Sequence, residues 1–200
     1  PLVMLDANES WNLPQAIRYI QHLEQTVEIA WVEEPLRRWD ASGLRRLRDA
    51  ISPAVATGEN LTGLEQYRQL FDAEAVDIVQ AAAVWGVTHS LRVAVAAHAR
   101  DLPVSPIGMT SNPSTMAVAT AIPNHLLTEV TTAQMPTGIT VDYEVADGGL
   151  VLGDLPGGGI AIDEALHAGE ADFVWGGEKG PHVRDSRTGL ELGVRRSVER

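Results

Sequence analysis

Short apolar runs recur along the chain, and longer stretches with helical spacing separate them. The runs are Leu2–Leu5, Ile29–Val32, Ala54–Gly58, Val76–Ala82, Leu102–Pro106 and His125–Val130. Strands that are apolar throughout are typical of a parallel sheet covered on both faces. The pattern therefore predicts six β strands that alternate with α helices, which is an α/β fold. The sixth predicted strand is followed by no recognisable helix.

The stretches between the runs carry helix signals. Asn12 followed by Pro14 is typical of a helix start, and the apolar residues behind them fall on one face. Asp40 gives a similar start signal, and so does Asn112 before Pro113. Besides the helix behind Asn12, the pattern predicts helices at Leu44–Ile51, Thr88–Arg100 and Ser114–Ala121.

Three carboxylates stand at the ends of the first three runs. They are Asp6, Glu33 and Glu59, which are separated by 27 and 26 residues. A strand, a turn, a helix and a second turn occupy about that length, so the three acids should end neighbouring parallel strands. Converging carboxylates repel one another unless a positive charge lies between them. A hard divalent cation such as Mg²⁺, which prefers oxygen ligands, fits this arrangement.

The sheet is open or closed into a barrel, and the acids favour a barrel. In a barrel the functional residues gather at the carboxyl ends of the strands, where Asp6, Glu33, Glu59 and Glu129 all fall. In an open sheet, acids from three consecutive strands would fan apart. A closed barrel of this type has eight strands, so we expect two further strands before Leu2.

The pattern changes after Thr131. From Gly138 to Asp154 apolar and polar residues alternate around Asp147-Gly148-Gly149, which predicts a β hairpin. The run Gly157-Gly158-Gly159 lacks the Gly-Lys-Ser/Thr ending of a phosphate loop and predicts a flexible turn. One helical turn is predicted at Asp163–His167, and the composition from Gly176 onward is rich in Gly, Arg and Glu.

Composition narrows the function further. The 200 residues are 44% hydrophobic, enough for one ordinary core, and the net charge of −12 argues against a nucleic-acid surface. The chain has no cysteine, which excludes disulfides and thiolate chemistry. No apolar run reaches about 18 residues, so no membrane span is expected. The first residues resemble no signal peptide, so we expect a cytoplasmic protein.

Several motifs in fixed order resemble the enolase superfamily, in its mandelate racemase/muconate lactonizing enzyme-like subgroup. The matching pieces are Leu5-Asp6-Ala7-Asn8, Trp31-Val32-Glu33-Glu34-Pro35, Thr57-Gly58-Glu59-Asn60, Gly86-Val87-Thr88 and Asp154-Leu155-Pro156-Gly157-Gly158-Gly159-Ile160. The resemblance implies a modified TIM barrel of the (β/α)7β type with a capping domain built from the chain termini. This chain would correspond to the barrel from about its third strand onward, with a C-terminal segment that returns to the cap.

The resemblance also implies roles for individual residues. Asp6, Glu33 and Glu59 match the Mg²⁺ ligands, and Asn8 matches a position that faces the substrate or an active-site lysine. Glu129 matches an acid that hydrogen-bonds the substrate carboxylate. The family reaction removes a proton α to a carboxylate through an enediolate, with the cation as Lewis acid. We expect Glu34 to be a structural acid, because strand neighbours alternate in direction.

Departures from the family pattern concern the catalytic bases. The subgroup has a Lys-x-Lys motif on its second strand, but the only lysine here is Lys179 in the tail. Ala81 and Ile107 stand near the positions of the subgroup's Asp–His pair, and neither side chain can move a proton. The acid–base groups are therefore expected to be absent or to lie elsewhere. One base is enough for dehydration, whereas racemisation normally needs two.

The sequence thus predicts three parts: residues 1–131, a partial barrel with the metal site; residues 132–170, a hairpin segment associated with the cap; and residues 171–200, a polar tail. The leading hypothesis is an Mg²⁺-dependent dehydratase of a hydroxy or sugar acid. The alternatives are a racemase or epimerase of the same superfamily and a non-catalytic metal-binding barrel subunit. The expected partners are a small carboxylic acid substrate, a complementing segment or chain that supplies the cap and first strands, and further copies in a homo-oligomer.

Overall fold

Five short strands form one parallel sheet in the computed structural model, which describes residues 2–82, 85–108, 113–130 and 138–163. The strands are β1 (Val3–Asp6), β2 (Ile29–Glu33), β3 (Ala54–Thr57), β4 (Ile78–Ala82) and β5 (Val104–Ile107). They lie side by side in chain order, and each pair is parallel. The curled sheet is part of a TIM-like barrel, so the predicted α/β barrel fold is confirmed.

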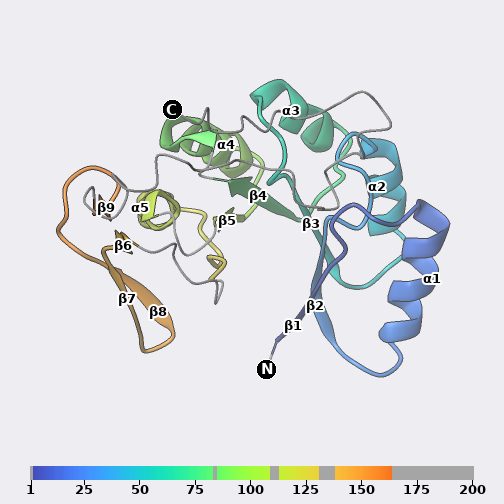
Figure 1. The fold of residues 1–200 in the computed structure, drawn as a ribbon. Helices are drawn as coiled ribbons and strands as arrows, with labels where there is room; N and C mark the ends of the chain where they lie inside the picture. The colour runs from blue at the N-terminus through green and yellow to red at the C-terminus, as the bar shows by residue number, and fades with distance from the viewer. Residues whose placement is uncertain (1, 83–84, 109–112, 131–137, 164–200) are drawn as a thin grey trace, which may run out of the picture. The chain divides into compact units, whose positions relative to one another are not determined.

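A helix follows each strand of the sheet (Figure 1). The helices are α1 (Leu13–Leu23), α2 (Ala41–Arg48), α3 (Leu64–Asp72), α4 (Val87–His98) and α5 (Pro113–Ala121). Asn12 caps α1 by accepting from the Gln15 N–H, and Asp40 caps α2 by accepting from the Gly43 N–H, as their side chains predict. Because Asp40 is the cap, α2 begins three residues earlier than its apolar pattern indicated, and it also ends three residues earlier, at Arg48.

The two faces of the sheet have different environments. The main core lies between the sheet and the helices and includes Val32, Val55 and Val79. The other face holds a smaller cluster of Trp31, Ala56 and Ile78, which is the inside of the partial barrel. Alternate residues of a strand point to opposite faces, so this second face continues to the residues at the carboxyl ends of the strands.

The strand predicted at His125–Val130 is largely absent. His125 forms a single parallel bridge with Val104. In this bridge the Val104 N–H donates to the Asn124 carbonyl, and the Leu126 N–H donates to the Val104 carbonyl. The next rung needs an N–H at position 106, and that residue is Pro106. The Glu129 N–H still donates to the Pro106 carbonyl at 3.4 Å, so this segment follows β5 without becoming a regular strand.

The predicted hairpin is confirmed. The strands β7 (Tyr143–Ala146) and β8 (Gly149–Leu152) pair antiparallel, and the Ala146–Gly149 pair closes the turn. Asp147 and Gly148 both have positive φ, 51° and 77°, as a type I′ turn requires. The short strands β6 (Ile139–Val141) and β9 (Ile160–Ile162) form a separate two-stranded sheet.

Backbone contacts divide the chain into two compact units. One contains Pro1–Gln134 with Val141–Ile160, and the other contains Met135–Thr140 with Ala161–Arg200. The helical turn predicted after Asp163 and the polar tail lie outside the described residues. None of the helices in the described ranges is long and apolar enough to cross a membrane.

Candidate metal centre

The three predicted ligands come from three neighbouring strand ends. Asp6 and Glu33 are the last residues of β1 and β2, and their Cα atoms are direct partners in the parallel register. Glu59 lies two residues beyond β3. Leu5 and Val32 face the helix layer, so Asp6 and Glu33 point to the opposite face, the inside of the partial barrel.

A fourth carboxylate, that of Glu129, influences the pKa of two of the predicted ligands. Burial raises the pKa of Glu33 to about 7, and the negative charges of Asp6 and Glu129 add to the effect. Burial also raises the pKa of Glu59 to about 7, with contributions from Glu34, Glu33 and Glu129. Asp6 and Glu129 thus act electrostatically on both Glu33 and Glu59, and the role of these carboxylates as a site stays a prediction.

Each predicted ligand has a neighbour with a left-handed backbone. Asn8, two residues after Asp6, has φ 44°, and Glu34, directly after Glu33, has φ 39°. Gly58, directly before Glu59, has φ 132°. Non-glycine residues adopt positive φ at a cost, and such residues cluster at functional sites. The turns that carry the three carboxylates thus share an uncommon backbone geometry.

Asn8 is engaged with Asp6 in this structure. The Asn8 backbone N–H donates to Asp6 Oδ1 at 2.9 Å, and the Asn8 side-chain amide donates to Asp6 Oδ2. Both residues are exposed. The side chain predicted to face substrate therefore also orients a predicted ligand.

Glu34 and Glu59 share one amide group. The Asn60 side-chain nitrogen lies 2.9 and 3.2 Å from the two Glu34 carboxylate oxygens and 3.1 Å from Glu59 Oε1. Glu34 is only 1% exposed, which agrees with a structural rather than a ligating role. Burial raises the pKa of Glu34, and the Asn60 hydrogen bonds oppose that shift.

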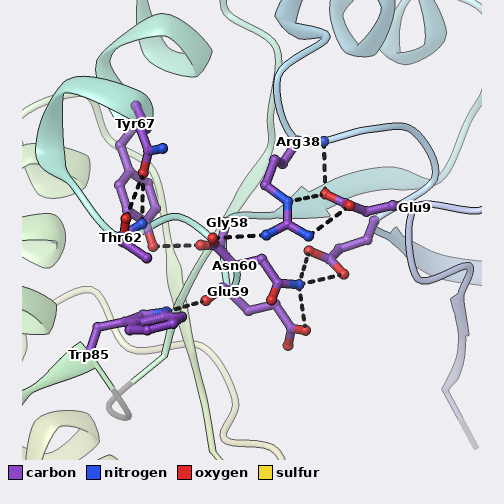
Figure 2. Close-up of polar contacts among 10 residues, drawn as sticks. Glu9, Arg38, Gly58, Glu59, Asn60, Thr62, Tyr67 and Trp85 are labelled. Carbon is purple, nitrogen blue, oxygen red and sulfur yellow. Dashed lines mark hydrogen bonds and ion pairs between the residues drawn. The ribbon is translucent and has the colours of Figure 1, made fainter. Parts of the chain in front are cut away.

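An ion pair ties the loops after β1 and β2 to the loop after β3. Arg38 donates to both Glu9 carboxylate oxygens, at 2.6 and 2.8 Å, and its backbone N–H donates to Glu9 Oε1 at 2.9 Å. The same guanidinium donates to the Asn60 carbonyl at 3.1 Å. Figure 2 shows Arg38 between Glu9 and the Gly58–Asn60 segment. The Arg38 hydrogen bonds lower the pKa of Glu9 against the opposing effect of burial.

Two aromatic residues hold the Glu59 turn from other elements (Figure 2). The buried Tyr67 hydroxyl on α3 lies 2.7 Å from the Gly58 carbonyl and 3.0 Å from the Gln80 carbonyl, and it donates to one of them at a time. Trp85, two residues before α4, donates its ring N–H to the Glu59 carbonyl at 2.8 Å. Trp85 is 45% exposed.

The ends of β4 and β5 carry no group that can transfer a proton. Ala81 packs in the core toward the helices, so Ala82 rather than Ala81 shares the face of Gln80 and the site. Ala82 and Ile107, the last residues of β4 and β5, are both apolar, and the absence of the Asp–His pair stays a prediction. The fully buried Gln80 amide lies near enough to Glu33 to lower its pKa, although the geometry falls short of a hydrogen bond.

Glu9, Arg38 and Asn60 were not among the predicted site residues. A signal was available, because Glu9 and Arg38 have opposite charges and are 29 residues apart, about one strand–helix repeat. Glu34 and Asn60 are 26 residues apart, which is nearly the ligand spacing itself. Residues at such intervals lie on adjacent turns of the same edge of the sheet.

The donor chemistry fits Mg²⁺. All the candidate ligands are carboxylate oxygens, which a hard cation prefers, and their mutual repulsion leaves excess negative charge for a dication to offset. Within the described ranges, no three acidic or histidine side chains approach closely enough to form a ready-made cluster of ligands. Like charges spread apart, so a cation between them would have to draw the three side chains together.

Comparisons with known proteins match this fold. A family model described as enolase C-terminal domain-like matches residues 1–166. L-talarate/galactarate dehydratase from Salmonella typhimurium is 38% identical over 104 residues, which cover 50% of this chain and 26% of that enzyme.

Solved structures agree with the family match. A racemase from Streptomyces coelicolor with bound magnesium has a TM-score of 0.73 and 25% identity, and the match covers 82% of this chain and 45% of that one. An enolase from Bradyrhizobium complexed with magnesium and mandelic acid has a TM-score of 0.73 and 26% identity, with 84% and 46% covered. The chain thus spans about a quarter of the curated dehydratase and under half of these structures.

Proposed function

Because the chain belongs to the enolase C-terminal domain-like family, we propose that it carries the cation site of an enzyme that removes a proton α to a carboxylate. The proposed substrate is a hydroxy or sugar acid, and the proposed outcome is loss of water. The observation that supports the proposal is the position of Asp6, Glu33 and Glu59 at three adjacent strand ends, where their charges act on one another.

Each acid has a proposed role. Asp6, Glu33 and Glu59 would hold Mg²⁺, which supplies Lewis-acid stabilisation for the negative charge that develops on the substrate carboxylate. Asn8 would keep Asp6 oriented and present its amide at the mouth of the site. Glu129, exposed and in the same field, would contact the substrate.

The base would come from outside the described residues. The ends of β4 and β5 present Ala82 and Ile107, which leave that part of the site without a proton acceptor. One edge of β1 pairs with nothing in the described ranges, and Met4 beside it is 39% exposed. We propose that further strands, from the same or a second chain, pair there and bring the base. A homo-oligomer and the three-part division at 131 and 170 also remain predictions.

Dehydration is preferred over racemisation for a structural reason. Removal of an α proton and departure of a hydroxyl need one base, whereas racemisation normally needs one on each side of the α carbon. The apolar ends of β4 and β5 leave one side without such a group. The 38% identity to a dehydratase supports the same choice.

The direct test is exchange of the α proton in D₂O, followed by NMR over a library of hydroxy and sugar acids. The protein would be checked by native mass spectrometry for every subunit that it carries. We expect Mg²⁺-dependent exchange or loss of water for at least one acid.

The matched test variant is Glu33→Gln, which preserves the shape of the side chain and removes the charge of one predicted ligand. We expect it to reduce Mg²⁺-dependent turnover at least 100-fold, because a carboxamide binds a hard cation poorly. Turnover unaffected by EDTA, or an unchanged rate in Glu33→Gln, would contradict the proposed cation site. No exchange with any acid in protein of verified composition would favour the non-catalytic alternative.

A further inference from the structure

The amide of Asn60 occupies an unusual position between two acids. Its nitrogen donates to the buried carboxylate of Glu34 at 2.9 Å and to Glu59 Oε1 at 3.1 Å. An amide has one donor and one acceptor end, and an ionised carboxylate only accepts. The nitrogen must therefore face both acids while they are ionised, and its two hydrogens are the groups that separate them.

Glu34 depends on this contact. It is 1% exposed, and within the described part of the chain its carboxylate oxygens accept hydrogen bonds only from Asn60. A buried carboxylate without a donor is costly and repels neighbouring charges. If the Asn60 amide were removed, the Glu34 carboxylate would repel that of Glu59, and the Glu59 carboxylate would lose its only hydrogen-bond donor among the described residues.

The backbone of Asn60 is itself held by a hydrogen bond from Arg38. The Arg38 guanidinium donates to the Asn60 carbonyl at 3.1 Å, and Arg38 is fixed by the two-oxygen contact with Glu9, which is 5% exposed. The loops after β1, β2 and β3 are therefore joined by one continuous set of hydrogen bonds. These are the same three loops that carry or follow Asp6, Glu33 and Glu59.

We propose that Asn60 is a positioning residue that holds Glu59 in place for a divalent cation and separates it from the buried charge of Glu34. The Glu9–Arg38 pair fixes the backbone from which Asn60 acts. This inference rests on the proposed function, since it requires that Glu59 binds the cation. Asn60 touches neither the cation nor the substrate and acts only through Glu59 and Glu34.

The test is the Mg²⁺ dissociation constant of the Asn60→Ala protein, measured by titration calorimetry. We expect binding about 10- to 100-fold weaker than in the unchanged protein, the usual effect of losing a group that orients a ligand. Asn60→Ser is the second variant. Its shorter side chain stays polar but cannot reach two carboxylates, so we expect weaker binding there as well.

A matched control distinguishes positioning from simple stability. Asn124 also uses its amide inside the fold, donating to the carbonyls of Ala94 and Leu102 at 3.2 and 2.9 Å, but these contacts are to helix α4 and the turn that follows it. Asn124→Ala should lower the melting temperature and leave the Mg²⁺ dissociation constant unchanged. Equal dissociation constants for the Asn60 variants and the unchanged protein would overturn the inference.

Glu59→Gln separates this inference from the proposed function. If Glu59→Gln weakens Mg²⁺ binding but both Asn60 variants bind normally, the cation site stands and the role of Asn60 is wrong. If Glu59→Gln also binds normally, the cation site itself is wrong, and the inference fails with it.

Discussion

At the scale of single residues, the site depends on backbone conformations that most side chains avoid. Asn8, Glu34 and Gly58 all have positive φ, and each lies within two residues of a predicted ligand. Asparagine tolerates this region, but for glutamate it is unusual. The surrounding hydrogen bonds, such as the Glu9 N–H to the Glu34 carbonyl at 2.7 Å, hold these turns in place.

Gly58→Ala tests this dependence. At φ 132° an alanine is strained, and its Cβ would lie 2.6 Å from the Gln80 carbonyl oxygen and 2.8 Å from the Tyr67 ring. We expect a loss of about 2–3 kcal/mol in the free energy of unfolding, together with weaker Mg²⁺ binding because the Glu59 turn moves. Urea denaturation and calorimetry measure the two effects.

Gly148→Ala is the control for Gly58→Ala. Gly148 also has positive φ, 77°, but a Cβ there meets nothing within 4 Å. It should therefore cost less stability and leave Mg²⁺ binding unchanged. Equal effects of the two alanines on Mg²⁺ binding would contradict a specific role for the Glu59 turn.

At the scale of elements, the strand–helix repeat places ion pairs at both ends of the sheet. Arg48 pairs with Asp77 at 2.6 Å and is 29 residues away in sequence, like the Glu9–Arg38 pair. Asp77 precedes β4 and also accepts from the Val55 N–H at 2.9 Å. This contact lies at the amino ends of the strands, away from the carboxylates. In barrels of this type, that end serves stability rather than function.

Asp77→Ala should therefore affect folding alone. The change removes the partner of Arg48 and leaves the buried Val55 N–H without an acceptor, at a cost of about 1–3 kcal/mol. We expect a lower midpoint in urea with an unchanged Mg²⁺ dissociation constant and rate of α-proton exchange. A change in Mg²⁺ affinity as large as that of Glu59→Gln would show that the two ends of the sheet are coupled.

Local signals explain which elements were predictable. The caps of α1 and α2 and the Asp147-Gly148 turn depend on a few neighbouring residues, so the sequence predicts them well. The prediction of a strand at His125–Val130 was wrong, because the neighbouring strand β5 has Pro106 where a backbone N–H donor is needed. Pro106 interrupts pairing only if the segment approaches the edge of β5 toward which the missing N–H would point. The sequence does not specify that edge, whereas the tertiary structure does.

At the scale of the whole molecule, the carboxylate site should make stability depend on pH. The pKa of both Glu33 and Glu59 rises from 4.5 to about 7 on folding, so the folded protein binds more protons than the unfolded chain in that interval. In the ion-free protein, the contribution of these two groups to the free energy of unfolding is then fully present below about pH 4.5 and is lost as the pH rises toward 7. Glu9 has a lowered pKa, so its opposite contribution lies below this interval.

Chemical denaturation at pH 5 and pH 8, in EDTA and in Mg²⁺, measures this effect. We expect the EDTA sample to lose about 1–2 kcal/mol between the two pH values, after allowance for solvent screening of these half-buried groups. Mg²⁺ should reverse the loss, because it binds the ionised form. The Glu33→Gln protein should show a smaller loss than the unchanged protein, and stability that rises from pH 5 to pH 8 in EDTA would contradict the expected sign.

The sequence by itself determined the repeating strand–helix order, the helix caps, the hairpin and the positions of Asp6, Glu33 and Glu59 at consecutive strand ends. These follow from periodicity and short-range chemistry, which every window of the chain carries. Only the tertiary structure decided that Asn60 lies between Glu34 and Glu59, that Arg38 joins three loops, and that Ala82 rather than Ala81 faces the site. These contacts depend on the direction of side chains from segments one strand–helix repeat apart. The burial of the acids in those segments then raises their pKa values.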